Sequence, residues 1–247
     1  MRRCLVGPGA QFERPGLPLR VRLTQRPEGR ESLQEKRTTV AERAPEYSNK
    51  SVFLNIPYDN KFSRLYLAYI TGLIHLDLDP HATIEIPGGR NRLDKILDLI
   101  GSCRYSIHDL SRVELDRNPP STPRFNMPFE LGLAVATARL GSNPHDWFVF
   151  ETMHRRASKS LSDLSGTDPN IHHGTVGGVM RELCNSFVRR GRQERYSVPE
   201  MLKTYRAVTR LVEDFQRITG ARSLFEAAVF RLICFAAVRA AGMPRGD

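Results

Sequence analysis

The chain has 247 residues, of which 40% are hydrophobic and 26% charged, so it can bury one sizeable core and has the composition of an ordinary soluble protein. Its formal net charge of +10 admits nucleic acid, an anionic ligand or a membrane surface as a partner and does not choose among them. The four cysteines lie far apart and form no Cys-x-x-Cys pair, which argues against a zinc ribbon or a secreted disulfide framework and indicates a reducing cytoplasm.

The first fifty residues differ in composition from the rest of the chain. Residues 1–50 are rich in proline and arginine and hold few large apolar residues, which predicts a disordered basic tail. The opening residues lack the apolar core of a signal peptide. No nucleic-acid-binding motif accompanies the positive charge, so we do not expect nucleic acid as the main partner. A tail that contacts nucleic acid remains an alternative interpretation.

Strand and helix patterns alternate from Ser51 onward. Residues 52–56 form a short apolar run ended by Pro57, which predicts a buried strand. Phe62, Leu65, Tyr69 and Leu73 then recur at helical spacing. A second strand is expected at 83–86, closed by Pro87-Gly88-Gly89.

The same alternation continues to about residue 190. A helix over 93–100, stopped by Gly101, precedes a strand over 105–110. The next helix is expected over 127–140, with Asn126 as N-cap and Gly141 beyond its end. A strand at 147–150 and a helix at 176–189 follow. This order predicts an α/β domain over 51–190, with a parallel sheet covered by helices on both faces.

Two further helices are expected over 197–243. Ser197 with Glu200, and Ser223 with Glu226, have the spacing of a capping box. The last helix is apolar on much of its circumference, so we expect it to be buried against the domain or against a second subunit in a homo-oligomer. Residues 224–238 are too short and too interrupted by charge to cross a bilayer, which needs about 20 apolar residues. We therefore expect a soluble, cytoplasmic protein without a membrane partner.

One region carries most of the functional information. Residues 106–111, Ser-Ile-His-Asp-Leu-Ser, end a predicted strand, and residues 126–134, Asn-Met-Pro-Phe-Glu-Leu-Gly-Leu-Ala, begin a helix. These two stretches resemble the TIR-like and nucleoside 2-deoxyribosyltransferase-like families. The resemblance implies a flavodoxin-like sheet, a catalytic helix glutamate at Glu130 that breaks N-glycosidic bonds in NAD or nucleosides, and a ribose contact at Asp109. Bacterial TIR enzymes often act in defence against phage.

The residues themselves support chemistry of this kind. Glu130 lies in the first turn of its helix, where the helix dipole favours the ionised carboxylate. A carboxylate stabilises an oxocarbenium-like transition state, and the cationic nicotinamide of NAD leaves as a neutral molecule without a proton donor. A neutral nucleoside usually needs an acid as well, and Asp109 is the candidate for that role.

Other predicted ligand residues lie on loops that follow the strands, because ligands of parallel sheets sit beyond the carboxyl ends of the strands. Gly88 and Gly89 would permit close approach of a phosphate, and neighbouring arginines would supply charge. The same residues are equally consistent with simple turns and caps. The predicted substrate-binding residues are Tyr58, Asp59, Gly88, Gly89, Arg90, Arg92, Asp109, Ser111, Arg124 and Asn126.

Several reaction classes lack their signatures. The chain has no Gly-x-Gly-x-x-Gly fingerprint, no phosphate-binding Gly-Lys-Ser/Thr loop and no Gly-x-Ser-x-Gly elbow. His108-Asp109 lacks partner histidines, so no metal site is predicted. His172 and His173 either line the crevice or cap the following helix, and we favour the cap. The sequence thus predicts an N-glycosidase with no cofactor, acting on NAD or a nucleotide; a nucleotide-sensing module without turnover is the alternative.

Overall fold

The computed structural model describes residues 46–89, 91–112, 115–116, 119, 122–156, 159, 161–164, 166–188 and 197–242. The predicted tail therefore lies outside the described residues as far as residue 45, and Arg90 lies outside them as well. The described residues all belong to the compact unit that begins at Arg43.

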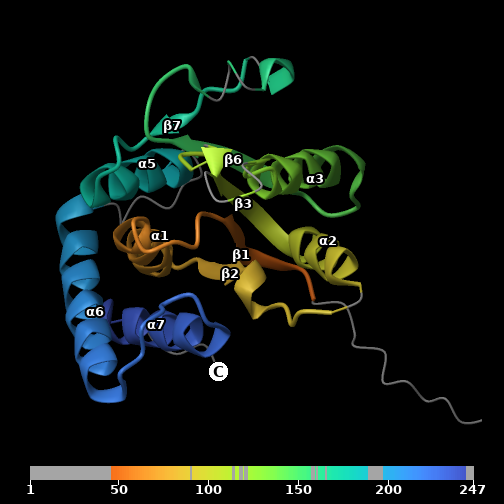
Figure 1. Ribbon diagram of the computed structural model, residues 1–247. Coiled ribbons are helices and arrows are strands. Elements are labelled where there is room, and N and C mark those ends of the chain that lie inside the picture. The colour runs from red at the N-terminus through yellow and green to blue at the C-terminus, as the bar shows by residue number, and fades with distance from the viewer. Residues whose placement is uncertain are drawn as a thin grey trace, which may run out of the picture. The chain divides into compact units, whose positions relative to one another are not determined.

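A five-stranded sheet, parallel throughout, forms the centre of this unit (Figure 1). The strand order is β2-β1-β3-β6-β7, so the first strand lies between the second and the third. This confirms the predicted α/β class, and the order is consistent with a flavodoxin-like sheet. The strands are β1 Ser48–Asn55, β2 Asp79–Ala82, β3 Cys103–Asp109, β6 Asp146–Glu151 and β7 Asn170–Ile171.

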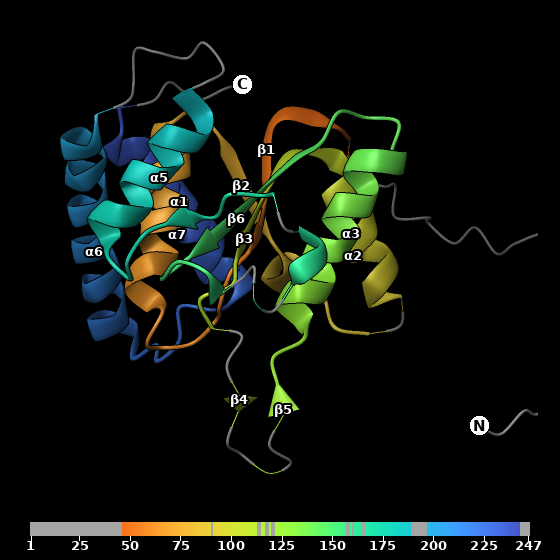
Figure 2. The ribbon, with the colours of Figure 1, turned by 90° about the horizontal axis from the view of Figure 1, so that it is seen from above.

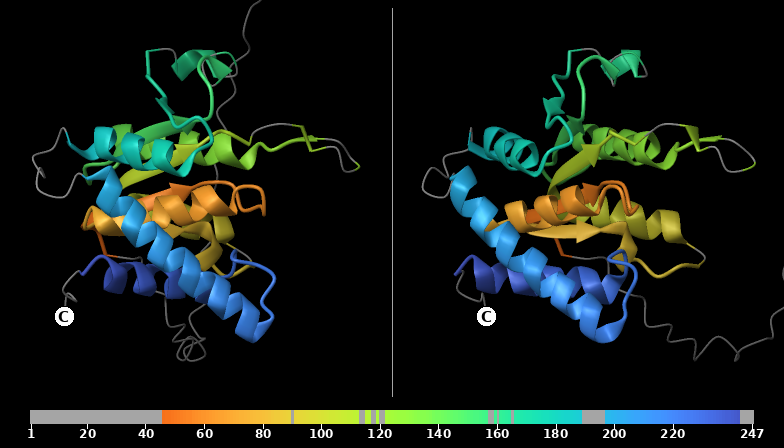
Figure 3. Two further views of the ribbon diagram at one scale, coloured as in Figure 1. Left: turned by 90° about the vertical axis from the view of Figure 1, so that its left-hand side faces the viewer. Right: turned by 60° about the vertical axis from the view of Figure 1, so that its left-hand side comes forward.

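Helices cover both faces of the sheet, as the alternation predicted. Figure 2 shows α2 and α3 on one face and α1 and α5 on the other. The two C-terminal helices, α6 and α7, pack against α1 (Figure 3). The helices are α1 Ser63–His75, α2 Arg92–Ser102, α3 Asn126–Leu140, α5 Val176–Val188, α6 Val198–Thr219 and α7 Ala227–Ala240.

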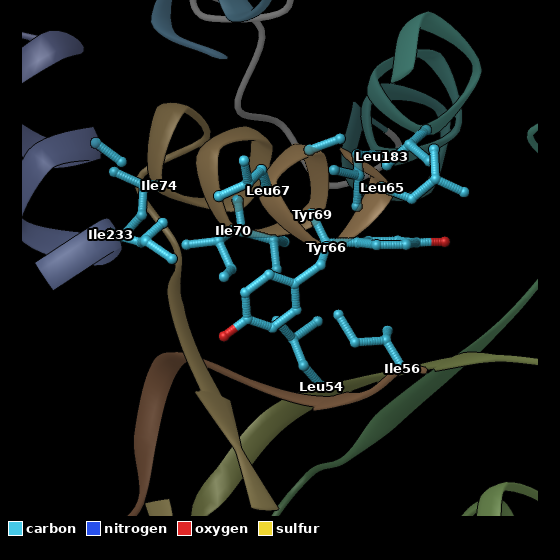
Figure 4. Packing of buried hydrophobic residues seen from close by; sticks show 14 of the residues in the cluster. Leu54, Ile56, Leu65, Tyr66, Leu67, Tyr69, Ile70, Ile74, Leu183 and Ile233 are labelled. Atoms are coloured by element: carbon cyan, nitrogen blue, oxygen red, sulfur yellow. The ribbon is translucent and has the colours of Figure 1, made fainter. Parts of the chain in front are cut away.

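The larger core lies between α1 and its neighbours. Side chains of α1 point toward Leu54 of β1 and Ile56 just after it, while Leu183 of α5 and Ile233 of α7 approach α1 from its other sides (Figure 4). Gly72 permits the close approach of α5, because a Cβ there would lie 2.6 Å from Leu183 Cδ1. Phe230 and Ile233 of α7 are thus buried within the same chain, whereas Leu232 and Phe235 are exposed.

The opposite face has two smaller clusters. One surrounds Phe53 and Ile100 under α2, and the other surrounds Leu110 and Leu131 under α3. Buried polar side chains of β1 and β3 lie on this face.

The second predicted strand was wrong in position. β2 occupies Asp79–Ala82, and the predicted residues form the short 3₁₀ helix η1, Thr83–Glu85. The Glu85 side chain accepts a hydrogen bond from Ala82 N at 2.9 Å, which ends the strand. Pro80 fits within β2 because this is an edge strand that pairs only with β1.

Several predicted boundaries were also wrong. Asn126 is the first residue of α3, and Phe125 occupies the cap position without a side-chain cap bond. Ser197 occupies the N-cap position of α6, but its side chain makes no cap hydrogen bond. The last helix begins at Ala227, because Ser223 bonds the nearby Phe225 N instead of forming a capping box.

Two pairs of residues form short strands that periodicity did not predict. They are β4 Leu115–Asp116 and β5 Thr122–Pro123, an antiparallel pair between β3 and α3. Within the described part of the chain, no helix combines the length and the apolar character that crossing a bilayer requires.

Candidate functional site

The topology defines one crevice position at the carboxyl ends of the strands. The chain leaves β1 through α1 and leaves β3 through α3, and these helices cover opposite faces of the sheet. Connections that diverge in this way create the crevice in which doubly wound proteins bind ligands. The loop after β1 carries Tyr58 and Asp59, and the connection after β3 leads to Glu130.

Glu130 is the fifth residue of α3 and is partly buried. Burial raises the pKa of its carboxyl group to about 7, and the nearby Arg92 opposes this rise. Among the described residues no hydrogen bond or ion pair holds the carboxyl group. The sequence places Glu130 in the first turn, where the dipole favours the ionised form, but Glu130 lies beyond that turn and the loss of solvation shifts its carboxyl group toward the neutral form.

Two predicted ligand residues lie within electrostatic reach of Glu130. Arg92 donates to the carbonyl oxygens of Ile86 at 2.8 Å and Thr83 at 3.1 Å, so its guanidinium is fixed to the η1 segment. Burial raises the pKa of Tyr58, and the charge of Glu130 adds to this rise. The structure thus brings Tyr58, Arg92 and Glu130 together from three separate segments.

Asp59 holds two arginines at the same end of the sheet. Its Oδ2 lies 3.3 Å from Arg112 Nε and 3.2 Å from Arg124 Nη1. Its Oδ1 accepts the backbone N–H groups of Lys61 and Phe62 at 3.0 and 3.1 Å, which fixes the start of α1. One carboxylate therefore faces two guanidinium groups, which leaves a net positive charge. Arg112 is not among the predicted ligand residues.

Asp109 is completely buried at the end of β3. Tyr69 OH and His172 Nε2 lie 2.7 and 3.1 Å from its Oδ2, and Ser111 N donates to its Oδ1 at 2.8 Å. A contact between Asp109 and a ribose stays a prediction, and it requires neighbouring groups to move aside, because the carboxyl group is fully buried. The sequence did not indicate Tyr69 as a partner of Asp109, because Tyr69 falls at one of the apolar positions that predict α1.

His172 joins Asp109 to the loop before α5. Its Nδ1 accepts the Gly174 N–H at 3.1 Å, so the proton of the neutral ring lies on Nε2. Nε2 faces both Asp109 Oδ2 and Ser111 Oγ, the latter at 3.0 Å. Because both ring nitrogens are engaged, His172 is not arranged as a base for a Ser111 nucleophile. The His172 carbonyl also accepts Thr175 N–H just before α5.

The remaining predicted ligand residues lie at the surface. Gly88 and Gly89 are exposed beyond η1, and Gly89 has φ of +140°, a conformation that favours glycine. Asn126 is exposed at the start of α3. Their role in binding stays a prediction.

In the part of the chain that the structure describes, no group of three or more His, Cys, Asp or Glu side chains is arranged to hold a metal ion. Comparisons of the chain with protein-family models, with curated proteins and with solved structures find no match.

Proposed function

We propose that this protein is an N-glycosidase with a flavodoxin-like, TIR-like fold that cleaves NAD or a related nucleotide, with Glu130 as the catalytic carboxylate. The observation that carries the proposal is the Glu130 carboxyl group. It is partly buried beside the β1/β3 crevice, lacks a hydrogen-bonding partner in the described residues, and has a pKa near 7. Carboxyl groups perturbed in this way are typical of catalytic sites. The resemblance adds a role in bacterial defence, and the scattered cysteines indicate the cytoplasm.

The reaction requires the ionised form of Glu130. The bond between ribose C1′ and the nicotinamide nitrogen breaks, and its electron pair leaves with neutral nicotinamide. The carboxylate stabilises the positive charge that develops on the ribose, and water adds to C1′ with loss of a proton. With a pKa of about 7, a large share of Glu130 is ionised at neutral pH.

Charge at the crevice favours a phosphorylated substrate over a nucleoside. Arg112 and Arg124 share the single carboxylate of Asp59, so a phosphate group would balance the excess positive charge. Both guanidinium groups are partly exposed and retain N–H donors beyond those directed at Asp59.

A second candidate function is a nucleotide sensor without turnover. The observation that favours it is Asp109, whose oxygens are taken by protein donors. A sensor would bind a nucleotide saturably and release no product.

The test is incubation of the purified full chain at high concentration with NAD, and separately with a panel of nucleosides, followed by mass spectrometry. We expect nicotinamide release by the wild type and by Glu213→Gln, which removes an exposed carboxylate of α6. Glu130→Gln should release none. Nicotinamide release by Glu130→Gln would reject the catalytic role. Calorimetry that shows binding without product would select the sensor, and absence of both would reject both proposals.

The pH profile separates the two substrate classes. An ionised Glu130 predicts that the rate rises as pH increases through about 7. A neutral nucleoside for which Glu130, and not Asp109, is the proton donor predicts a rate that falls over the same range.

A further inference from the structure

Four polar side chains form a continuous hydrogen-bonded series on the sheet face under α2 and α3. They are Asn55 of β1, His108 and Ser106 of β3, and His145 just before β6, and each is at most 7% exposed. The separations are 2.9 Å from Asn55 Nδ2 to His108 Nδ1, 3.0 Å from His108 Nε2 to Ser106 Oγ, and 2.9 Å from Ser106 Oγ to His145 Nε2.

The two ends of this series fix its direction. Asn55 Nδ2 lies 2.8 Å from the Met127 carbonyl oxygen, which only accepts, so the amide nitrogen faces both Met127 and His108. His108 Nδ1 must then accept, and its proton lies on Nε2.

The far end leads to the same assignment. His145 Nδ1 lies 2.8 Å from the Cys103 carbonyl oxygen and therefore donates to it. His145 Nε2 is left as the acceptor of the Ser106 hydroxyl, and Ser106 Oγ accepts from His108 Nε2. Each N–H or O–H group of the series thus has one acceptor. Asn55 donates to His108, His108 to Ser106, Ser106 to His145, and His145 to the Cys103 carbonyl oxygen.

Both imidazole rings must be neutral for this order to exist, because each one supplies an acceptor nitrogen. Burial lowers the pKa of His108 to about 3, with a smaller lowering from His145. Burial also lowers the pKa of His145; the Cys103 carbonyl and Asp146 oppose this, and Arg104 adds to it. The series is therefore intact at neutral pH.

We propose that Asn55 is a positioning residue for Glu130, and that the two histidines keep its amide nitrogen directed at the first turn of α3. Asn55 is the last residue of β1, and Met127 is the second residue of α3, three before Glu130. One buried side chain thus joins the strand that leads to Tyr58 with the helix that carries Glu130. The positioning role rests on the proposed function, whereas the hydrogen-bond order does not.

Asn55→Asp tests this proposal without a change of shape. A carboxylate cannot donate to the Met127 carbonyl, and it attracts a proton to His108 Nδ1. His108 Nε2 then accepts from Ser106, which no longer donates to His145. Loss of the tie to α3 should bring Glu130 into better contact with water and lower its pKa. Asn49→Asp, an exposed change on the same strand, is the matched control.

The measurement is NMR on the full chain, with ¹⁵N-labelled histidine and ¹³C-labelled glutamate. We expect wild-type His108 to carry its proton on Nε2 and His145 on Nδ1. In Asn55→Asp the His108 proton should appear on Nδ1, and the Glu130 midpoint should fall by on the order of one pH unit. A wild-type His108 protonated on Nδ1 overturns the proposal even if the variant fails to fold. So does a Glu130 midpoint that is the same in Asn55→Asp and Asn49→Asp.

Activity distinguishes this proposal from the proposed function. Asn55→Asp should lower kcat for NAD about tenfold or more with little change in KM, because a displaced catalytic group loses rate rather than binding. If Glu130→Gln is inactive while Asn55→Asp keeps the wild-type kcat, positioning is wrong and the proposed function stands. If Glu130→Gln remains active, the proposed function fails. The NMR experiment still shows whether the hydrogen-bond order is correct.

Discussion

The face of the sheet under α1 and α5 is covered by a continuous core, whereas the face under α2 and α3 has two small clusters and a series of buried hydrogen bonds. On the first face, the C-terminal helices α6 and α7 pack against α1 and extend the same core. The buried side chains of this face are mostly apolar. The second face carries Glu130 and the side chains that tie α3 to β1. Apolar packing tolerates small shifts, while directed hydrogen bonds do not. We conclude that the first face supplies most of the stability and the second fixes the geometry of the site.

The largest effect is expected where α5 begins, on the apolar face. A Cβ at Gly178 would lie 2.0 Å from the His172 carbonyl oxygen, so Gly178→Ala must displace backbone. We expect a loss of about 4 kcal/mol or more in the free energy of unfolding, measured with urea. Gly177→Ala, where a Cβ has no neighbour within 4 Å, should change stability by less than about 1 kcal/mol. Similar losses in both variants would contradict the close contact.

Replacing one buried isoleucine on each face compares how much the two faces contribute to stability. Ile70 of α1 is completely buried in the large core, and Ile96 of α2 is 8% exposed in a small cluster. We expect Ile70→Ala to cost about 4 kcal/mol and Ile96→Ala about 2 kcal/mol in urea unfolding. Equal costs would show that the two faces contribute alike.

Glu130 should lower stability at neutral pH. Its pKa is about 7 in the fold against an ordinary 4.5, so the folded state binds a proton between these values that the unfolded state has lost. Stability therefore falls as pH rises from 4.5 to 7, and the full loss of about 3 kcal/mol applies above pH 7. The free energy of unfolding of Glu130→Gln should exceed that of the wild type by roughly this amount at pH 8 and by little at pH 4.

The check for Glu130 is urea unfolding at the two pH values, with Glu213→Gln as the control. If Glu130→Gln and Glu213→Gln show the same dependence on pH, the carboxyl group of Glu130 is not shifted by burial.

The smallest effect concerns the arginines at Asp59. Arg112→Gln and Arg124→Gln should each weaken binding of a phosphorylated nucleotide about tenfold and leave binding of the parent nucleoside unchanged. Arg210→Gln, which removes an exposed charge from α6, should alter neither. Calorimetry with both ligands makes the comparison. If binding of the nucleotide and of the nucleoside weakened equally, the arginines would support the structure of the loop and would not contact the phosphate.

Local patterns predicted those elements whose burial repeats along the chain. The apolar spacing from Phe62 to Leu73 predicted α1, and the run before Asp109 predicted β3. β2 was misplaced because an edge strand accepts a proline that reads locally as a break. The two-residue strand β7 carries too few residues to form a pattern.

The candidate site divides in the same way. The sequence by itself selected Glu130 through the resemblance and its place near the start of a helix, and it selected Tyr58 and Arg92 because they follow predicted strands. Only the tertiary structure decided that burial raises the pKa of Glu130, since solvation depends on neighbours from distant segments. It also decided that Asn55 bonds His108, 53 residues away, and Met127, 72 residues away. Side-chain periodicity records which face of an element is buried, and it carries no record of the partner that a buried polar group meets there.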